Sequence, residues 1–225
     1  MNNHEDPRIS YVRSKIKSYP DFPKKGIDFK DLFSAMRDTK ALGYLIDLVK
    51  EKSREMKGQI DCVVGLDSRG FLFGPIMANE IGVAFVPVSD LELGILIQYY
   101  HVAPILNTNA ISYIVLHNGN VYFLKVRKKG KLPGALKGIE YALEYGSAEC
   151  EVQKEAFETT QRVLIVDDLL ATGGTMRAAV DLIQGLSSDI VECFVIMELS
   201  FLKAPLGRAK IPAGIKVSSL ISYDD

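Results

Sequence analysis

Short runs of consecutive apolar residues recur along the chain, and each has the length of a buried strand. The run from Val163 to Val166 is unbroken, which is typical of a strand covered on both faces in a parallel sheet. Runs of the same kind stand at Cys62–Leu66, Val83–Val88, Ile190–Met197 and Val217–Ile221. Apolar residues recur at helical spacing in three segments, 9–19, 42–49 and 176–183, and a further helix is expected to end at about residue 81. Strands that alternate with helices predict an α/β fold, with a mainly parallel central sheet flanked by helices.

Strict alternation of apolar and polar residues covers 139–145 and 148–153. Between the two segments, Gly146-Ser147 suits a two-residue hairpin turn. We therefore expect a β-ribbon that forms a lid or hood, with Glu144 on its outward, polar face.

The first part of the chain predicts a helix and then a loop. Asp6 followed by Pro7 is a common helix start, and the helix is expected to follow from there. The two prolines and the glycine of segment 19–31 predict an extended loop without regular structure, anchored by Phe22 and Phe29.

Composition narrows the class of protein. A chain of 225 residues suits a single domain, spanning 1–225, with a sizeable core. Hydrophobic residues make up 48%, charged residues 24%, and the net charge is −1. Because there is no polybasic excess, small molecules are expected as partners, rather than nucleic acid or an anionic membrane.

The cysteines and the N-terminus indicate a cytoplasmic protein. Cys62, Cys150 and Cys193 are odd in number, far apart and without C-x-x-C spacing, so neither a disulfide framework nor a zinc site is indicated. The polar residues 1–6 do not resemble a signal peptide, and no run reaches the roughly 18 apolar residues of a membrane helix.

Candidate chemistry gathers after the run Val163–Val166. Asp167 and Asp168 follow it, and ionised carboxylates can accept hydrogen bonds from the vicinal hydroxyls of a sugar. Thr172-Gly173-Gly174-Thr175 then lets the backbone approach a ligand closely, and the helix behind it offers free N–H groups to an anion. A strand, an acidic loop and a helix without any ligand would explain the apolar run, but neither the adjacent carboxylates nor the double glycine.

The stretch from Val163 to Thr175 resembles the phosphoribosyl diphosphate (PRPP) loop of the type I phosphoribosyltransferases. The resemblance implies that Asp167 and Asp168 orient the ribose and that Leu169 packs on the base. The 5′-phosphate would be held by five residues: Ala171, Thr172, Gly173, Gly174 and Thr175.

Three further stretches extend the resemblance to the adenine phosphoribosyltransferases of that family. Gly65–Pro75 matches the diphosphate loop, which implies that Ser68 and Arg69 bind diphosphate; an arginine in a turn is otherwise merely solvated. Val126–Gly134 is similar to the start of the family's mobile hood. A run of charges is usually only a solvated loop. Here the resemblance implies that three cations of the run contact diphosphate: Arg127, Lys128 and Lys131.

Two other matches concern the base. The stretch 19–31 is very similar to the segment that lines the family's adenine pocket, which implies that the backbone at Asp28 and Lys30 reads adenine. Glu144 matches the family's Leu-Glu-Tyr-Gly and would assist the imidazole nitrogen of the base. Glu on a strand is more often just a solvent-facing residue.

The resemblance implies purine salvage, in which adenine and PRPP give AMP and diphosphate. It also implies Mg²⁺ held mainly through PRPP, no metal site made by the protein alone, and a homodimer. Two rival functions remain: a phosphoribosyltransferase for another base, or a regulatory or inactive PRPP-binding isoform.

One stretch, Ser89–Lys125, departs from the family, where the preceding strand runs almost directly into the basic hood. Asn118-Gly119 between two β-rich segments is a strong hairpin signal, which favours a genuine inserted element. The same residues are those that A/T-rich codons supply, and the two junctions can be encoded by splice-site-like sequences. The interpretation we favour at this stage is a translated intron.

Overall fold

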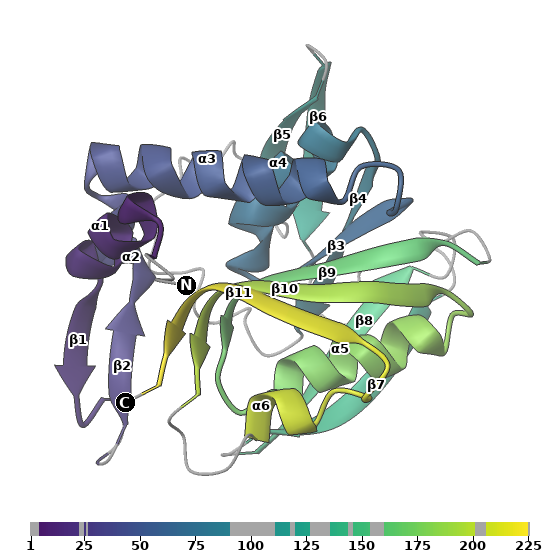
Figure 1. Cartoon of the computed structure of the whole chain (residues 1–225). Coiled ribbons are helices and arrows are strands. Elements are labelled where there is room, and N and C mark those ends of the chain that lie inside the picture. Colours follow the sequence, from purple (N-terminus) through teal and green to yellow (C-terminus); the bar gives the residue numbers. More distant parts are fainter. Residues whose placement is uncertain are drawn as a thin grey trace. The chain divides into compact units, whose positions relative to one another are not determined.

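The computed structural model describes residues 5–22, 25, 27–90, 111–117, 120–126, 136–143, 146–153, 160–200 and 206–224. The chain divides into two compact units, Met1–Glu55 and Met56–Asp225. Figure 1 shows their helices and strands in chain order. Within the described ranges, no helix is both long enough and apolar enough to cross a bilayer.

The N-terminal unit combines helices with a two-stranded antiparallel sheet. Its elements are α1 (Pro7–Lys15), β1 (Lys17–Pro20), β2 (Asp28–Asp31), α2 (Leu32–Met36) and α3 (Thr39–Glu55). α1 begins as predicted, because the Asp6 carboxylate accepts a hydrogen bond from the Arg8 backbone N–H at 2.8 Å. The rings of Tyr11 and Tyr44 meet edge to face at 5.6 Å and pack α1 on α3.

The first helix is shorter than its apolar spacing predicts. α1 ends at Lys15, whereas the periodic pattern continues to Tyr19. The cause is a contact distant in sequence: the Ser34 hydroxyl accepts a hydrogen bond from the Lys17 N–H at 2.8 Å. The same hydroxyl shares its proton between the Asp31 carbonyl at 2.6 Å and the Lys15 carbonyl at 2.9 Å. Tertiary structure thus overrides local periodicity at this helix end.

Segment 19–31 is not the wholly irregular loop that its prolines predict. β1 and β2 pair in antiparallel register, which runs as far as Pro20 opposite Asp28. Both strands are edges of a two-stranded sheet, and an edge strand tolerates proline. The expected anchors contact each other, with the rings of Phe22 and Phe29 edge to face at 5.4 Å.

The larger unit is built on a seven-stranded sheet in the order β11-β10-β9-β3-β4-β8-β7. The neighbours from β11 to β4 are parallel, and β8 and β7 continue the sheet in antiparallel pairing. This confirms the predicted α/β fold with a mainly parallel sheet. The strands are β3 (Cys62–Leu66), β4 (Ala84–Asp90), β7 (Leu136–Leu143), β8 (Gly146–Gln153), β9 (Arg162–Leu170), β10 (Asp189–Leu199) and β11 (Lys216–Tyr223).

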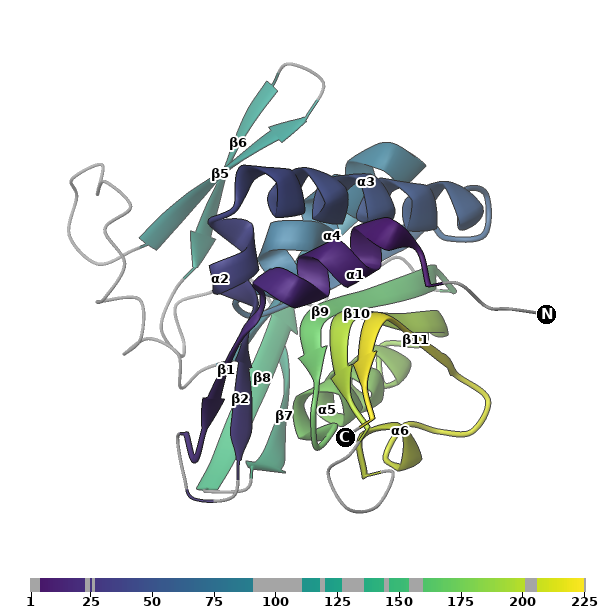
Figure 2. The ribbon, with the colours of Figure 1, turned by 60° about the vertical axis from the view of Figure 1, so that its left-hand side comes forward.

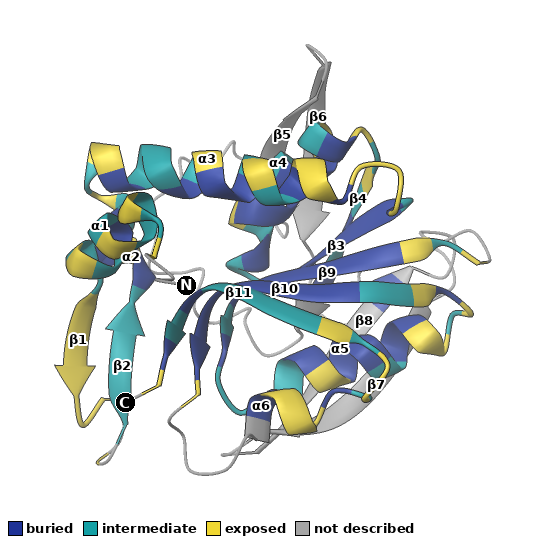
Figure 3. Ribbon diagram, in the orientation of Figure 1, coloured by how far each residue is buried: buried dark blue, intermediate teal, exposed yellow. Residues whose placement is uncertain are grey.

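Helices cover both faces of this sheet. α4 (Gly70–Ile81) and α5 (Gly174–Gln184) lie on opposite faces, as Figures 1 and 2 both show, and α6 (Leu206–Ala209) is a single short turn. Val163 and Ile165 face the core under α5, so that the alternate residues of β9 face α4. Figure 3 shows β3, β9 and β10 buried over most of their length, which is what their apolar runs predict.

The ribbon β7–β8 has a different turn from the one predicted. Leu143 pairs with Gly146, so Gly146 and Ser147 begin β8 instead of forming the turn. Residues 144 and 145, which connect the strands, lie outside the described residues. Moving the turn by two residues keeps every side chain on its face of the ribbon, and alternation alone therefore cannot distinguish the two registers.

The atypical stretch contains the hairpin that Asn118-Gly119 predicts. β5 (Ile111–His117) and β6 (Asn120–Val126) pair in antiparallel register, with His117 opposite Asn120. They form a two-stranded sheet of their own, separate from the seven-stranded sheet. The hairpin is confirmed, and the origin of the insertion stays a prediction.

Candidate functional site

The site is centred on two adjacent carboxylates on β9, Asp167 and Asp168, which we call the Asp pair. We expected the pair where the strand ends, but β9 continues to Leu170 because β10 pairs with it beyond the pair. On the other side, β3 accompanies β9 only as far as Val166. The pair therefore lies just beyond the last residue of β9 that pairs with β3, close to the turn that follows β3.

Both carboxylates are buried, with Asp167 9% and Asp168 2% exposed. The Asp168 backbone N–H donates a hydrogen bond to Asp167 Oδ1 at 2.8 Å. Burial raises the pKa of Asp167 well above its usual value, and the neighbouring Asp168 charge raises it further. Burial also raises the pKa of Asp168, although the charge of Arg69 opposes that rise. Two charges that are so poorly solvated favour the arrival of hydrogen-bond donors.

Arg69 is the cation that faces the Asp pair. It belongs to the turn between β3 and α4, where Ser68 and Arg69 are both half-buried. Its Nε lies 3.1 Å from Asp168 Oδ2, within ion-pair distance. Within the described part of the chain, however, Oδ2 accepts no aligned hydrogen bond. The guanidinium, with 32% of its side chain exposed, can therefore turn toward a ligand without breaking an ideal fork.

Residues Ala171–Thr175, which we call the glycine loop, join β9 to α5. Gly173 is the N-cap of α5 with a φ of 74°, a left-handed conformation that favours glycine. No side chain among the described residues caps this helix, so the amides of its first turn stay available to an anion. The loop thus offers anion-binding amides directly beside acceptors for hydroxyl groups.

The structure brings together most of the predicted site residues of the larger unit. They are Ser68, Arg69, Asp167, Asp168, Leu169 and the glycine loop, at the carboxyl ends of β3 and β9. Asp28 and Lys30 lie in β2 of the N-terminal unit, where Lys30 Nζ contacts Asp28 Oδ2 at 2.8 Å. The remaining predicted residues lie outside the described residues: Arg127, Lys128, Lys131 and Glu144.

Sequence reasoning missed a second carboxylate–arginine pair at the same edge of the sheet. Glu198 stands near the end of β10, 5% exposed, and Arg208 of α6 donates to its Oε1 and Oε2 at 2.5 and 2.6 Å. A signal was present, since Glu198 interrupts an apolar strand, where a buried carboxylate requires a partner. The partner could not be identified from the sequence, because nothing in the pattern links it to position 208.

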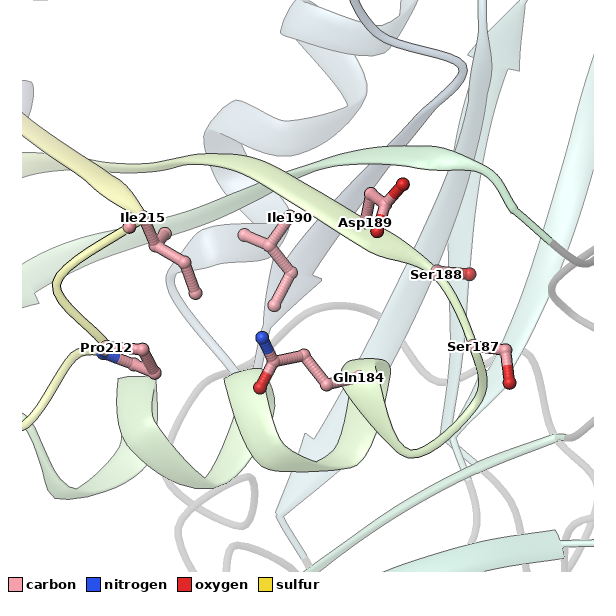
Figure 4. A pocket seen from close by; sticks show the side chains of 8 residues that line it. Gln184, Ser187, Ser188, Asp189, Ile190, Pro212 and Ile215 are labelled. Atoms are coloured by element: carbon pink, nitrogen blue, oxygen red, sulfur yellow. The ribbon is translucent and has the colours of Figure 1, made fainter.

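A pocket of about 630 Å³ opens elsewhere, near the start of β10. Figure 4 shows Gln184, Ser188, Asp189 and Ile215 among its lining residues. It contains none of the predicted site residues and lies at the opposite end of β10 from Glu198. Because ligands of parallel α/β sheets bind outside the carboxyl ends of the strands, the Asp pair is the stronger candidate.

Comparison with known proteins shows the family of the chain. The family model of the phosphoribosyl transferase domain matches residues 39–216, and the chain belongs to that family. An adenine phosphoribosyltransferase of Drosophila pseudoobscura pseudoobscura is 39% identical over 218 residues, covering 97% of this chain and 97% of that protein. The adenine phosphoribosyltransferase of Homo sapiens is 38% identical over 223 residues, covering 97% and 99%. Within the wider family, the chain is thus a member of the adenine phosphoribosyltransferases.

A solved structure shares the fold. The adenine phosphoribosyltransferase from Saccharomyces cerevisiae, complexed with D-2,5-dideoxy-2,5-imino-altritol 1,6-bisphosphate and adenine, superposes with a TM-score of 0.70 at 34% identity. The match covers 95% of this chain and 98% of that one. The resemblance seen in the motifs therefore extends to the whole architecture.

Proposed function

We propose that the chain catalyses the transfer of the phosphoribosyl group from PRPP to adenine, giving AMP and diphosphate, a step of purine salvage. The observation that carries the proposal is the buried Asp pair beside the uncapped start of α5. This arrangement offers acceptors for two ribose hydroxyls next to donors for a phosphate. Membership of the adenine phosphoribosyltransferases supports the choice of reaction and of base.

Each part of PRPP has a matching group. Asp167 and Asp168 accept hydrogen bonds from the ribose hydroxyls, which relieves the poor solvation of their charges. The backbone amides of the glycine loop hold the 5′-phosphate. Ser68 and Arg69 bind the diphosphate, and Arg69 turns from Asp168 toward it. Binding of PRPP would thus replace a single imperfect ion pair by several charge-assisted bonds.

The protein's task in this reaction is to neutralise the departing diphosphate and to position the base, because the protein itself forms no covalent bond. The base nitrogen forms a bond to C1′ while the bond from C1′ to the diphosphate oxygen breaks, through a ribosyl cation-like state. Arg127, Lys128 and Lys131 would neutralise the departing diphosphate, and Glu144 would assist the imidazole nitrogen of the base. Leu169 packs on the base, and the backbone at Asp28 and Lys30 reads it.

The proposal includes Mg²⁺, which would neutralise charge on the diphosphate when bound. Mg²⁺ takes about six oxygen ligands and keeps several waters. One oxygen of the Asp pair already accepts a backbone N–H, so the pair would supply only a few of the oxygen ligands of the ion. The ion would therefore be held mainly through PRPP oxygens. The homodimer implied by the family and a reducing, cytoplasmic location, with Cys62 and Cys193 as free buried thiols, complete the proposal.

The choice of base is tested by the rate of diphosphate release with adenine, guanine and hypoxanthine. A pocket that pairs with the exocyclic amine leaves its groups unsatisfied against a carbonyl, so adenine should be preferred by at least about 10⁴-fold. Efficient turnover of hypoxanthine would instead establish a phosphoribosyltransferase for another base.

The catalytic role of Glu144 is tested by Glu144→Gln. The substitution removes the charge but keeps the shape, and it should lower kcat by about 10²-fold or more with little change in KM for PRPP. Glu140→Gln, on the preceding strand of the same ribbon, is the matched control and should leave kcat unchanged. Full turnover in Glu144→Gln would make this residue an ordinary part of the surface.

The regulatory or inactive alternative depends on the inserted stretch Ser89–Lys125. Its first two residues, Ser89 and Asp90, belong to β4 and pair with Glu151 and Cys150 of β8. Closing the rest of the stretch as a loop costs about 3 kcal/mol, which a domain stable by about 5–15 kcal/mol survives. The stretch ends directly before the basic run, where displacement by an ångström can cost about a hundredfold in rate. Deleting residues 91–125, which keeps the β4–β8 pairing, should therefore raise both thermal stability and adenine-dependent diphosphate release. A less stable or less active deletion variant would show that the hairpin β5–β6 is a genuine part of the protein.

A further inference from the structure

The glycine loop rests on a second glycine far along the chain. A Cβ built on Gly173 would lie 2.5 Å from the Gly207 carbonyl oxygen and 2.8 Å from Gly207 Cα. A Cβ built on Gly207 would lie 2.7 Å from the Ala171 carbonyl oxygen and 3.1 Å from Leu170 Cγ. Ordinary contact begins at 3.4 Å, so neither position has room for a side chain. The loop and α6 therefore meet backbone to backbone.

Gly207 and Gly173 require glycine for different physical reasons. Gly173 has a φ of 74°, so its conformation alone favours glycine. Gly207 is not among the described residues with positive φ, and only the close approach of the glycine loop excludes a side chain there. A substitution at Gly207 consequently acts on the loop through space, without altering the loop's own sequence.

Arg208 fixes the position of α6. Its guanidinium donates to Glu198 Oε1 and Oε2 at 2.5 and 2.6 Å, and to the Val217 carbonyl at 2.7 Å. Glu198 accepts a further hydrogen bond from the Ser219 hydroxyl at 3.1 Å. One arginine thus ties α6 to β10 and β11 at once, through a planar fork that lysine cannot reproduce.

These contacts form a continuous support. β10 and β11 hold Arg208, Arg208 holds α6, and Gly207 of α6 touches the glycine loop. Glu198 pairs in register with Leu170, the last residue of β9 before the loop. The support therefore begins on β10, the strand next to the one that carries the Asp pair, and it reaches the glycine loop through α6.

We propose that Gly207 and Arg208, held by Glu198, are positioning residues that set where the glycine loop presents its amides to the 5′-phosphate. The inference rests on the proposed function, because it assigns that phosphate to the loop. Both residues act through the glycine loop and belong to neither the loop nor the Asp pair. Their effect should consequently appear in the binding of phosphate-bearing ligands and not in the recognition of the base.

The decisive variant is Gly207→Ala, which places a methyl group 2.7 Å from the Ala171 carbonyl oxygen. The loop must shift by several tenths of an ångström, and because an ångström can cost about a hundredfold, KM for PRPP should rise about tenfold. The affinity for AMP, measured by titration calorimetry, should fall by a similar factor. KM for adenine at saturating PRPP and the melting temperature should change little.

Gly214→Ala is the matched control, since a Cβ at Gly214 meets nothing within 4 Å and this glycine belongs to the same C-terminal segment. It should leave both KM values unchanged. Arg208→Lys should fall between the wild type and Arg208→Ala in AMP affinity, because lysine keeps the charge but not the fork.

The outcomes separate the two proposals. If the wild type neither releases diphosphate with adenine nor binds AMP, the proposed function is wrong and the positioning role is wrong with it. If the wild type is active but Gly207→Ala leaves AMP affinity and KM for PRPP unchanged, only the positioning role is overturned. An equal rise in both KM values, or a loss of folded protein in Gly207→Ala without an AMP effect in Arg208→Lys, would reduce α6 to a purely structural element.

Discussion

Two buried carboxylates stand near the carboxyl ends of neighbouring strands, each beside an arginine, and the two arginines satisfy them to different degrees. Glu198 on β10 receives both arms of the Arg208 fork, at 2.5 and 2.6 Å, and the Ser219 hydroxyl. Asp168 on β9 has Arg69 at 3.1 Å, and in the described residues its Oδ2 accepts no aligned hydrogen bond. Similar chemistry thus has a satisfied and an unsatisfied form on adjacent strands.

The difference separates support from site. The carboxylate of Glu198 accepts hydrogen bonds on both oxygens, so it has little left to offer a ligand, and its bonds hold α6 in place. A buried carboxylate with open lone pairs carries a desolvation penalty that an incoming donor can relieve. We therefore expect ligands to act directly on the Asp168–Arg69 pair, and the Glu198–Arg208 pair to affect ligand binding only through the position of α6.

The largest expected effect is a loss of PRPP affinity when the charges of the Asp pair are removed. Asp167→Asn with Asp168→Asn removes both charges while keeping the shape of the side chains. Each lost charge-assisted bond should cost about 1.5–3 kcal/mol, so the affinity for PRPP should fall by roughly 10²-fold or more. The measurement is calorimetric titration with PRPP and Mg²⁺, beside a thermal melt that should show an intact fold.

The control for this double variant removes a carboxylate that stands on the surface of α5. Asp181 forms an exposed i,i+4 pair with Arg177 at 2.9 Å, which contributes only about 0.3–0.5 kcal/mol. Asp181→Asn should leave PRPP affinity unchanged. If the folded double variant binds PRPP as the wild type does, the ribose role of the Asp pair is refuted.

A smaller effect comes from truncating the two arginines in turn. Arg208→Ala leaves Glu198 buried and unpaired. That would cost about 3–5 kcal/mol in a fully buried pair, but Arg208 is half-exposed, so we expect about 1–2 kcal/mol of unfolding free energy. Arg69→Ala should change unfolding free energy by less than about 1 kcal/mol, because its ion pair lacks an aligned fork, yet weaken PRPP binding about tenfold.

Denaturant unfolding gives the unfolding free energy of each variant, and titration with PRPP gives its affinity for the ligand. The comparison holds if Arg208→Ala is the less stable variant and Arg69→Ala is the weaker binder of diphosphate. Should Arg69→Ala unfold more easily than Arg208→Ala, the ion pair at Asp168 would be part of the framework and not of the site.

Much of the larger unit could be predicted from its sequence. The apolar runs identify β3, β9 and β10, because strands buried on both faces have few polar positions. The spacing behind the double glycine identifies α5, and the adjacent carboxylates indicate the candidate site. In each case the signal is local, and the structure follows the local preference.

What could not be predicted depends on partners distant in sequence. The end of α1 at Lys15 is fixed by Ser34, and the fork on Glu198 is supplied by residue 208. The requirement for glycine at 207 arises from the carbonyl of Ala171. The turn of β7–β8 escaped prediction for another reason, since two registers place the same residues on the same faces. Local patterns contain none of this information.

The smallest effect is a dependence on pH that distinguishes buried from exposed carboxylates. Burial raises the pKa of Asp167 above the unfolded value of 3.8, so its stabilising contribution is present below pH 3.8 and is lost as pH rises through the folded pKa. Asp61 has the opposite sign. Its pKa is lowered to about 2 by hydrogen bonds from Arg162, so its contribution is present above 3.8 and is lost as pH falls toward 2. The melting temperature of unliganded Asp167→Asn should therefore rise relative to the wild type as pH increases above 3.8, whereas Asp61→Asn should fall relative to the wild type as pH increases from 2 to 3.8. A difference between Asp167→Asn and the wild type that stays constant with pH would contradict the raised pKa of Asp167, and the contrast with Asp61 would disappear.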